Sequence, residues 1–350
     1  MKRILFTGGG SAGHVVPNIA LMEELLLRGD LDVCYMGGDG IEKKLITDRH
    51  IPYYTIQPPK LIRGGGISAW KENLKIPFRL KKAVENAKKG LFDCKPDLVF
   101  SKGGFVALPV VLASKKLGIP CYAHESDLSI GLANKLSAKY CVNVFTSFPE
   151  TAKKLKNGVH SGAPIRQSVF LGNREAMRKK YKIGEGKKVL LVFGGGSGSQ
   201  AVNDAVRKNI KVLTEKYVIF HLCGRGNLIN SRITEYIQEE FNADMGGLYA
   251  MSDGILCRAG AGSVFETMQL QKPTLFVPLA KASRGDQLQN AEYFYQKGLC
   301  HILPQDNLDK LPEAVDRLFS DQALKERLQK NTVKDGRIFI AERLIRALEK

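Results

Sequence analysis

Short apolar runs alternate along the chain with longer stretches in which apolar residues recur every three or four positions. The runs have the length and composition of buried strands, whereas the longer stretches, such as Val15–Arg28 and Ser263–Leu270, have the period of helices packed on a sheet. This alternation is the pattern of parallel α/β sheets. The predicted strands are Arg3–Thr7, Val33–Met36, Leu98–Ser101, Pro120–His124 and Val142–Thr146, then Val189–Phe193, Val218–Leu222, Gly254–Cys257, Thr274–Val277 and His301–Leu303.

The pattern restarts in the middle of the chain. "GGGSAGHVVP" at 8–17 follows the first strand, and "GGGSGS" at 194–199 follows the first strand of the second half. The chain has 350 residues, more than one core usually supports. We therefore expect an α/β fold of two Rossmann-like domains facing a cleft, with ligands at the carboxyl ends of the strands. The expected domains are 1–162 and 163–335, with a C-terminal helix at about 336–350 packed on the first.

The first glycine segment has more than one interpretation. Gly8, Gly10 and Gly13 match the G-x-G-x-x-G dinucleotide fingerprint, but the match alone does not distinguish a redox cofactor from another phosphate-bearing ligand or from a tight turn. A dehydrogenase would place an acidic residue at the end of the second strand, where this chain reads "YMGGDG". Asp39 is the only acid there, and it follows a Gly-Gly turn.

Acid and base candidates follow two strands of the first half. His14 stands behind the glycine segment, where a helix start favours a neutral imidazole that could act as a base; a structural role is the alternative. "HESD" brings His124, Glu125 and Asp127 to another strand end as a second acid/base group.

"RAGAGSVFETM" in the second half suits a nucleotide diphosphate. A helix that starts near Ala261, Gly262 and Ser263 presents free N–H groups and a positive dipole end, and Glu266 could accept hydrogen bonds from ribose hydroxyls. Ser263 and Glu266 also fit the S-x-x-E capping box of an ordinary helix. Arg258 is either a counter-charge for phosphate or a surface residue.

Two further segments could reach the same ligand. The 194–199 loop contains more glycine than one turn requires, with Gly196 in its backbone and Ser197 and Ser199 as additional donors. "GAPIRQ" supplies Arg166 just beyond the domain junction. Whether Arg166 reaches the ligand is left open by the sequence.

Positive charge is concentrated in one part of the chain. The formal net charge is +18, and residues 60–89 hold nine basic and two acidic side chains. Pro77 would disturb a long helix, so we expect a loop and a short amphipathic segment. This pattern fits a peripheral membrane contact, with an ordinary docked helix as the alternative; nucleic acid is disfavoured because no binding motif is present. The apolar residues at helical steps are Ile67, Trp70, Leu74 and Phe78, surrounded by Lys71, Lys75, Arg79, Lys81 and Lys82.

Composition excludes several classes of protein. No apolar run is long enough for a transmembrane helix and no secretory signal is recognised, so we expect a cytoplasmic protein. The seven cysteines form no C-x-x-C, which indicates neither zinc nor a disulfide framework; we expect core cysteines. The single D-x-D, at Asp30 and Asp32, precedes a strand, the wrong end for a metal–nucleotide site. We expect no protein-bound metal.

Taken together, "GGGSAGHVVP", "SKGGFVALPVVLA", "HESDLSIGLANK", "GAPIR", "GGGSGS", "CRAGAGSVFE" and "DQLQNA" resemble the MurG family of peptidoglycan N-acetylglucosaminyltransferases, in glycosyltransferase family 28. The resemblance covers the whole chain in the same order. It implies the two-domain GT-B fold and inverting transfer of N-acetylglucosamine from UDP-GlcNAc to the C4 hydroxyl of MurNAc in undecaprenyl-pyrophosphoryl-MurNAc-pentapeptide (lipid I), giving lipid II.

The resemblance also assigns roles to residues. It implies that Glu266 binds the ribose, that the 261–263 helix start and Arg166 approach the diphosphate, that Gln287 reads sugar hydroxyls, and that His14 is the favoured base. The candidate catalytic residues are His14, Glu125 and Asp127; the candidate UDP-GlcNAc ligands are Ser11, Gly13, Arg166, Gly196, Ser197, Arg258, Ala261, Gly262, Ser263, Glu266 and Gln287; and the candidate acceptor or membrane contacts are Arg63, Trp70, Lys71, Leu74, Lys75 and Phe78.

The chain departs from the family pattern at a few positions. Ser126 and Asp127 stand where many members have Gln-Asn, Ser197 falls where many have a different glycine–serine order, and Asp286 replaces a first glutamine. The "HESD" and "SRGDQ" forms are similar to those of some Gram-positive members.

The resemblance implies a peripheral enzyme on the cytoplasmic face of the cell membrane. Its expected partners are UDP-GlcNAc, lipid I, the anionic inner face of that membrane and proteins of cell-wall synthesis or division, but not nucleic acid. No cofactor is expected to be essential, although a divalent cation could stimulate without being bound by the protein. The alternatives are a related transferase with another lipid acceptor, a UDP-GlcNAc 2-epimerase and a non-catalytic UDP-sugar-binding membrane scaffold.

Overall fold

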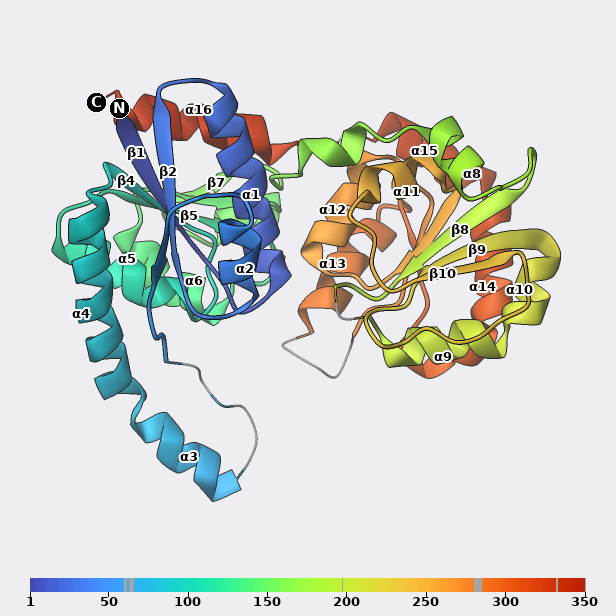
Figure 1. Cartoon of the computed structure of the whole chain (residues 1–350), viewed down its shortest axis with the longest axis horizontal. Coiled ribbons are helices and arrows are strands. Elements are labelled where there is room, and N and C mark those ends of the chain that lie inside the picture. The colour runs from blue at the N-terminus through green and yellow to red at the C-terminus, as the bar shows by residue number, and fades with distance from the viewer. Residues whose placement is uncertain (60–61, 63–65, 197, 280–284, 332, 350) are drawn as a thin grey trace. The chain divides into compact units, whose positions relative to one another are not determined.

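The structure is a computed structural model that describes all residues except 60–61, 63–65, 197, 280–284, 332 and 350. The chain divides into two compact units (Figure 1). Met1–Arg166 together with Asp335–Lys350 form the N-terminal domain, and Gln167–Lys334 form the C-terminal domain. Each domain is built on one sheet and is described by itself.

The N-terminal domain contains a seven-stranded parallel sheet with the strand order β3-β2-β1-β4-β5-β6-β7. Its central strands fall on the predicted apolar runs, whereas the short outer strands β3 and β7 were not predicted. The strands are β1 (Lys2–Thr7), β2 (Leu31–Gly37), β3 (Tyr53–Thr55), β4 (Leu98–Ser101), β5 (Cys121–Glu125), β6 (Val144–Thr146) and β7 (Gly158–His160).

Helices cover both faces of this sheet. Ile4 and Phe6 of β1 pack in one core cluster with α1 and α16, whereas Leu5 packs in the other cluster with α4 and α5. Alternate residues of β1 therefore serve opposite cores, as the period of a strand requires. The helices are α1 (Ala12–Leu27), α2 (Ile41–Thr47), α3 (Gly66–Leu74), α4 (Ile76–Cys94), α5 (Ala107–Lys116), α6 (Leu132–Ser137), α7 (Pro149–Lys153) and α16 (Gly336–Leu348), with a 3₁₀ turn at Ala138–Tyr140.

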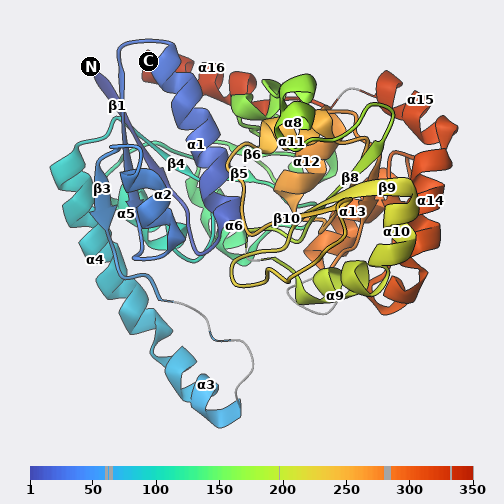
Figure 2. The ribbon, with the colours of Figure 1, turned by 45° about the vertical axis from the view of Figure 1, so that its right-hand side comes forward.

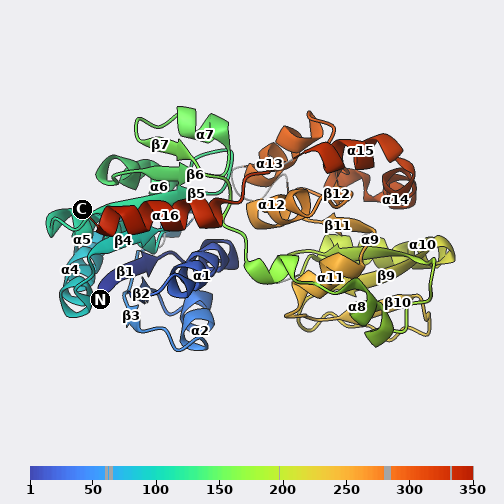
Figure 3. The same ribbon diagram turned by 90° about the horizontal axis from the view of Figure 1, so that it is seen from above.

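The last helix, α16, belongs to the N-terminal domain and lies beside α1 (Figure 3). Ile340, Ala341 and Leu344 are buried in the α1 cluster. Arg337 forms an ion pair with Glu24 of α1, with 3.3 Å between Nη1 and Oε2. Apolar packing and one ion pair of low exposure therefore fix the end of the chain to the first domain.

The segment around Pro77 differs from the prediction of a loop and a short amphipathic piece. The short helix α3 is present, but only Lys75 separates it from α4, which is 19 residues long. Pro77 lies in the first turn of α4, where its missing N–H breaks no helical hydrogen bond. The proline therefore begins a long helix instead of ending one.

The cysteine prediction needs one correction. Cys34 of β2 and Cys94 of α4 form a disulfide in the structure. The pair is 60 residues apart in sequence, and spacing motifs gave no sign of it. Packing of α4 on the sheet brings both into one core cluster. The other five cysteines are buried and unpaired, as expected of core residues.

The C-terminal domain contains a six-stranded parallel sheet with the strand order β10-β9-β8-β11-β12-β13. Every residue of β9, β11 and β12 is buried, because helices cover both faces of a parallel sheet. Two parallel-sheet α/β domains are thus confirmed. The strands are β8 (Lys188–Phe193), β9 (Tyr217–Leu222), β10 (Tyr236–Glu239), β11 (Gly254–Cys257), β12 (Thr274–Phe276) and β13 (His301–Ile302).

The helices of the C-terminal domain follow its strands in regular βα order. The one that matters most for the site, α12, comes directly after β11. The helices are α8 (Arg174–Lys180), α9 (Gln200–Lys208), α10 (Ile210–Lys216), α11 (Met245–Met251), α12 (Ala261–Gln269), α13 (Asp286–Tyr295), α14 (Leu311–Ser320) and α15 (Gln322–Lys330), with 3₁₀ turns at Gln167–Phe170 and Gln305–Lys310.

Candidate active site

Three loops meet at one edge of the N-terminal sheet. Strands β1, β4 and β5 are adjacent and parallel, so the loops that follow them leave at the same edge. Glycine lets these loops touch. A Cβ on Gly104 would lie 2.5 Å from the Gly9 carbonyl oxygen and 3.0 Å from the His14 ring. The structure thus brings the loops after β1 and β4 together around His14.

His14 lies in the first turn of α1, because that helix starts three residues earlier than predicted. Ser11 is the N-cap residue and accepts a 3.1 Å hydrogen bond from the His14 N–H at its carbonyl oxygen. Ser11 and Gly13 are exposed, whereas His14 is half-buried. The imidazole is therefore held at the meeting point of the loops, with the exposed start of α1 beside it.

Lys102, which the sequence analysis did not single out, is the first residue after β4. It is only 1% exposed, and its Nζ donates a 2.6 Å hydrogen bond to Ser126 Oγ. Burial lowers the pKa of Lys102, while the nearby carboxylates of Glu125 and Asp127 act in the opposite direction. A lysine at the end of an apolar strand, followed by two glycines, is the signal that could have found it.

Glu125 shapes the loop that follows β5. Its Oε1 accepts a hydrogen bond from the Asp127 N–H at 3.1 Å, and its Oε2 accepts one from the Gly131 N–H at 2.8 Å and one from Asn134 Nδ2 at 2.9 Å. The side chain is buried. These contacts give Glu125 the geometry of a group that positions Asp127.

His124, the neighbour of Glu125, points into the domain. It is fully buried, and its Nε2 lies 3.2 Å from the Gly162 carbonyl oxygen. Burial, and next the charge of Lys102, hold the pKa of His124 well below its usual value. His124 is therefore a neutral core histidine.

In the C-terminal domain, α12 has an open start. Gly260 is the N-cap residue, and Ala261, Gly262 and Ser263 are the first three helical residues. Their N–H groups precede the first intrahelical bond, from the Val264 N–H to the Gly260 carbonyl at 3.0 Å. A Cβ on Gly260 or Gly262 would meet nothing within 4 Å. The capping-box interpretation fails, because Ser263 lies inside the helix instead of at its N-cap.

Glu266 lies one turn further along α12. Its Oε2 accepts a 2.9 Å hydrogen bond from the Tyr249 hydroxyl of α11. The tyrosine is buried, whereas the glutamate is half-buried. Tyr249 therefore restricts the carboxylate of Glu266 from the side of the domain interior.

The structure contradicts one of the two alternatives that the sequence left open for Arg258, that of a surface residue. Its Nη2 donates to Ser199 Oγ at 2.7 Å and to Gln305 Oε1 at 2.6 Å, and its Nη1 donates to the Val277 carbonyl at 3.0 Å. The residue is 8% exposed, and burial lowers its pKa. Arg258 is therefore not a surface residue: it ties together the segments that follow β8, β12 and β13, and its role as a counter-charge for phosphate stays a prediction.

The remaining candidate ligands are less constrained by the structure. Gly196 is exposed, and Ser197 lies outside the described residues. Gln287, in the first turn of α13, accepts a 3.0 Å hydrogen bond from the Leu279 N–H at its Oε1. Arg166 is half-buried and is the last residue of the first segment of the N-terminal domain.

The predicted membrane contacts that the structure describes lie on α3 and the first two turns of α4, which we call the α3–α4 arm (residues 66–82). The arm extends away from the N-terminal sheet (Figure 2). Trp70, Leu74 and Phe78 are 64%, 55% and 80% exposed. Lys71 and Lys75 are exposed beside them, and Arg63 lies outside the described residues. The arm thus presents three large apolar side chains at helical spacing within a basic surface.

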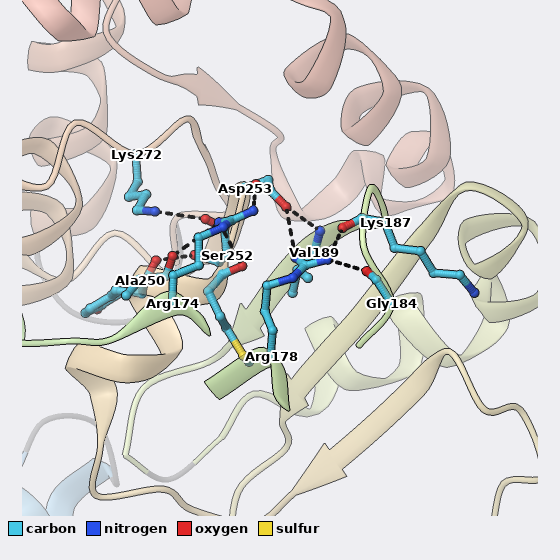
Figure 4. A network of polar contacts seen from close by, with 11 residues as sticks. Arg174, Arg178, Gly184, Lys187, Val189, Ala250, Ser252, Asp253 and Lys272 are labelled. Carbon is cyan, nitrogen blue, oxygen red and sulfur yellow. Dashed lines mark hydrogen bonds and ion pairs between the residues drawn. The ribbon is translucent and has the colours of Figure 1, made fainter. Parts of the chain in front are cut away.

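A polar network at the start of β8 and β11 involves none of the candidates (Figure 4). Asp253 accepts a 2.7 Å hydrogen bond from Arg174 and a 2.8 Å one from the Val189 N–H. Lys272 donates to the Ser252 carbonyl at 2.8 Å, and burial lowers its pKa. Because these contacts lie at the amino ends of the strands, they fasten α8 to the sheet edge opposite the open start of α12.

The described residues include no group of three or more His, Cys, Asp or Glu side chains that could hold a metal ion. Within the same part of the chain, no helix is long and apolar enough to span a membrane.

The fold is that of the two-domain GT-B glycosyltransferases. A crystal structure of MurG from Acinetobacter baumannii superposes with a TM-score of 0.76 over 98% of both chains, at 24% identity. The glycosyltransferase CalG4, which acts on calicheamicin, superposes with a TM-score of 0.73 at 15% identity over 100% of this chain and 99% of its own. At these identities the likeness concerns the fold alone.

Family models and curated relatives narrow the class. Residues 4–146 match the glycosyltransferase family 28 N-terminal domain, and residues 189–343 match its C-terminal domain. The chain belongs to glycosyltransferase family 28. Relatives named UDP-N-acetylglucosamine--N-acetylmuramyl-(pentapeptide) pyrophosphoryl-undecaprenol N-acetylglucosamine transferase include one from Clostridium botulinum, 42% identical over 87% of this chain and 86% of its own, and one from Geobacillus thermodenitrificans, 40% identical over 96% and 95%.

Proposed function

We propose that this chain transfers N-acetylglucosamine from UDP-GlcNAc to the C4 hydroxyl of MurNAc in lipid I, with inversion at the anomeric carbon, and so makes lipid II. The observation that carries the proposal is the open start of α12 with Glu266 one turn beyond it, in the domain that matches the family 28 C-terminal domain. The names of relatives aligned over most of the chain supply the acceptor.

The donor is proposed to bind the C-terminal domain. The N–H groups of Ala261, Gly262 and Ser263 suit the diphosphate, because a helix start combines unpaired donors with a positive dipole end. The carboxylate of Glu266 can accept both ribose hydroxyls, and its hydrogen bond from Tyr249 limits its rotamers beforehand. The other candidate ligands of the phosphates and the sugar remain Arg166, Gly196, Ser197, Arg258 and Gln287, together with Ser11 and Gly13 of the N-terminal domain.

His14 is proposed as the general base. Its neutral imidazole takes the proton of the C4 hydroxyl while that oxygen forms a bond to the anomeric carbon. The bond from the anomeric carbon to the UDP oxygen breaks, and the electron pair leaves with UDP. The N–H groups at the start of α12 stabilise the charge that grows on this leaving group. Asp127 is the second candidate base, and Glu125 positions it.

The reaction needs no redox step and no electron carrier, so we propose that no cofactor is essential. The helix start supplies the charge stabilisation that a metal ion supplies in other transferases. A divalent cation could still stimulate through the diphosphate of the donor without being held by the protein. Chelator should therefore leave a substantial part of the turnover intact.

The α3–α4 arm is proposed to contact the anionic cytoplasmic face of the cell membrane. Trp70, Leu74 and Phe78 can bury apolar surface among the lipid head groups, and the surrounding lysines and arginines are attracted to anionic lipid. A contact of this kind would keep the enzyme next to an acceptor whose lipid tail stays in the bilayer. Proteins of cell-wall synthesis or division remain proposed partners.

The membrane proposal can be tested with a matched variant. Co-sedimentation with phosphatidylglycerol vesicles should fall strongly when Trp70, Leu74 and Phe78 are all changed to Ser, and should weaken at high salt. Phe92→Ser is the control, because Phe92 is 73% exposed but lies near the other end of α4. Equal binding by the triple variant and the wild type would refute the arm as the contact.

The transfer itself is tested by UDP release from UDP-GlcNAc, with and without a lipid I analogue in detergent. We expect release only with the analogue, together with a disaccharide product. Formation of a UDP-linked epimer without any acceptor would favour an epimerase, release with diacylglycerol alone would favour another lipid acceptor, and donor binding without turnover on either acceptor would favour a non-catalytic scaffold. Each of these three results would overturn the proposal.

A further inference from the structure

Glu42 of α2 is a buried carboxylate beneath the first glycine loop. It is 1% exposed. Its Oε2 accepts a hydrogen bond from the Gly10 N–H and its Oε1 accepts one from the Gly38 N–H, both at 3.2 Å. Among the described residues, no lysine, arginine or histidine lies within ion-pair distance of it. Both carboxyl oxygens are therefore bound by backbone donors from the loops that follow β1 and β2.

Glycines surround this carboxylate on several sides. A Cβ on Gly9 would lie 2.5 Å from Glu42 Oε1, a Cβ on Gly40 would lie 2.7 Å from Oε2, and a Cβ on Gly38 would lie 3.1 Å from Oε1. We call Gly9, Gly10, Gly38 and Gly40 the Glu42 cage. Since only Gly10 of the four has a left-handed φ, contact with the carboxylate is what opposes a side chain at Gly9 and Gly40, whereas a Cβ on Gly38 would need the carboxylate to move by only a few tenths of an ångström.

Two tyrosines complete the support beneath the same loops. The Tyr35 hydroxyl donates to the Gly8 carbonyl at 2.8 Å, and the Tyr53 hydroxyl donates to the Gly38 carbonyl at 2.6 Å. Burial raises the pKa of Tyr53, and the Glu42 carboxylate raises it further. Both phenols therefore stay protonated and keep donating, and the glycine loop is fixed from below.

The cage is directly connected to His14. The Gly9 carbonyl oxygen lies 2.5 Å and the His14 ring 3.0 Å from the position that a Cβ of Gly104 would take, so both pack against that glycine. A shift of Gly9 would therefore change the space that the imidazole occupies.

We propose that Glu42 is a positioning residue for the reaction: by binding the N–H groups of Gly10 and Gly38, it sets the place of the loop after β1 and hence of His14. The N–H of Gly10 is directed at a carboxylate and is not available to a phosphate. This inference rests on the proposed function for its activity readout, but its structural part can be measured without any substrate.

The activity test separates kcat from donor binding. Glu42→Ala should lower kcat about 100-fold, because a loop displaced by about 1 Å misplaces the base, and Glu42→Gln should have a smaller effect in the same direction. The KM for UDP-GlcNAc should change less than about threefold, because the start of α12 and Glu266, which are proposed to bind the UDP, belong to the other domain. Glu24→Gln is the matched control: this buried carboxylate lies on the same helix as His14 but pairs with Arg28 and Arg337. It should keep near wild-type kcat at a similar loss of thermal stability.

A double-mutant cycle tests the cage by thermal unfolding alone. Gly9→Ala should destabilise the wild type strongly, since its Cβ would clash with Glu42, but should cost little in the Glu42→Ala background, where the space is vacant. Gly10→Ala is the control: Gly10 has a φ of +83° and its Cβ would meet the Phe105 ring, so it should destabilise both backgrounds equally.

The outcomes separate the inference from the function. Additive effects of Gly9→Ala and Glu42→Ala would refute the cage, and a kcat of Glu42→Ala equal to that of Glu24→Gln would refute the positioning role. If Glu42→Ala does not fold, Glu42→Gln supplies the kcat measurement, and Glu42→Asp, whose side chain is one methylene shorter, supplies the unfolding cycle. Absence of transfer by the wild type itself would instead refute the proposed function and leave the unfolding cycle as the test of the cage.

Discussion

Two glycine-rich strand exits of this protein, after β1 and after β11, look alike in sequence but differ in structure. After β1, Gly9 and Gly10 are packed against Glu42, Phe105 and the loop after β4, so their space is filled. After β11, Gly260 and Gly262 have open space at their Cβ positions. The first set of glycines makes close packing possible and the second leaves backbone accessible. Glycine content alone therefore does not identify a phosphate site; what occupies the missing side-chain positions does.

The largest effect expected from this comparison concerns the strand exit after β1, where the space around the glycines is filled. His14→Ala should lower turnover by about 10²- to 10⁴-fold, because the acceptor hydroxyl loses its base. Donor affinity should stay within a factor of about three, since the residue lies in the N-terminal domain. Steady-state kinetics combined with calorimetric titration of UDP-GlcNAc measure both quantities. Wild-type turnover would remove His14 from the mechanism and favour Asp127.

A change at the strand exit after β11, where the glycines have open space, should lower donor affinity more than turnover. Glu266→Ala should weaken UDP-GlcNAc binding about 10- to 100-fold, because hydrogen bonds to a charged group contribute about 1.5–3 kcal/mol, while turnover at saturating donor changes little. Tyr249→Phe, which removes only the hydrogen bond to the carboxylate, should have a much smaller effect on affinity. If Glu266→Ala bound UDP-GlcNAc as tightly as the wild type, its role as ribose ligand would be wrong.

Alanine should change the free energy of unfolding differently at a closely packed glycine and at a glycine with open space around its Cβ position. Gly104→Ala should destabilise the N-terminal domain by at least about 2 kcal/mol, because its φ is +80° and its Cβ would lie 2.5 Å from the Gly9 carbonyl. Gly262→Ala should be neutral or stabilise α12 by up to about 1 kcal/mol. Urea unfolding measures both. Similar losses at the two sites would contradict the difference between the exits.

The last expected effect concerns acid stability. Burial, and next the charge of Arg207, lower the pKa of His221 to about 3. As the pH falls from about 6.5, the unfolded chain binds this proton first, so stability is lost between about pH 6.5 and pH 3 at up to about 1.4 kcal/mol per pH unit. His221→Gln should reduce that slope in urea unfolding, whereas the exposed His50→Gln should not. An unchanged slope in His221→Gln would contradict a neutral buried histidine.

The sequence predicted the inner strands of both sheets because those are continuous apolar runs. It missed β3, β7 and β10, which are outer strands of three or four residues with half-exposed positions. Such strands are specified by their neighbours more than by their own composition. The start of α1 was predicted three residues too late, because Ala12 and Gly13 carry no apolar signal.

The candidate site could be predicted where all residues of a motif lie on one helix, because their spacing then fixes their relative positions. Residues 261–266 lie on one helix, so their spacing alone predicted a helix start with a glutamate one turn away. Lys102, Glu42 and the contacts of Arg258 depend on loops that are distant in sequence and adjacent only in the sheet. A single sequence does not encode which loops touch. This is why Arg258 had two interpretations and the structure supplied a third.

The central claim is that the open start of α12, and not the first glycine loop, receives the diphosphate. The most direct test is the affinity of UDP for Gly262→Asp. A side chain fits there, since nothing lies within 4 Å of the added Cβ, and its charge would face the diphosphate. The account predicts a loss of affinity of about 100-fold or more with unchanged unfolding. Wild-type affinity for UDP in this variant would contradict it.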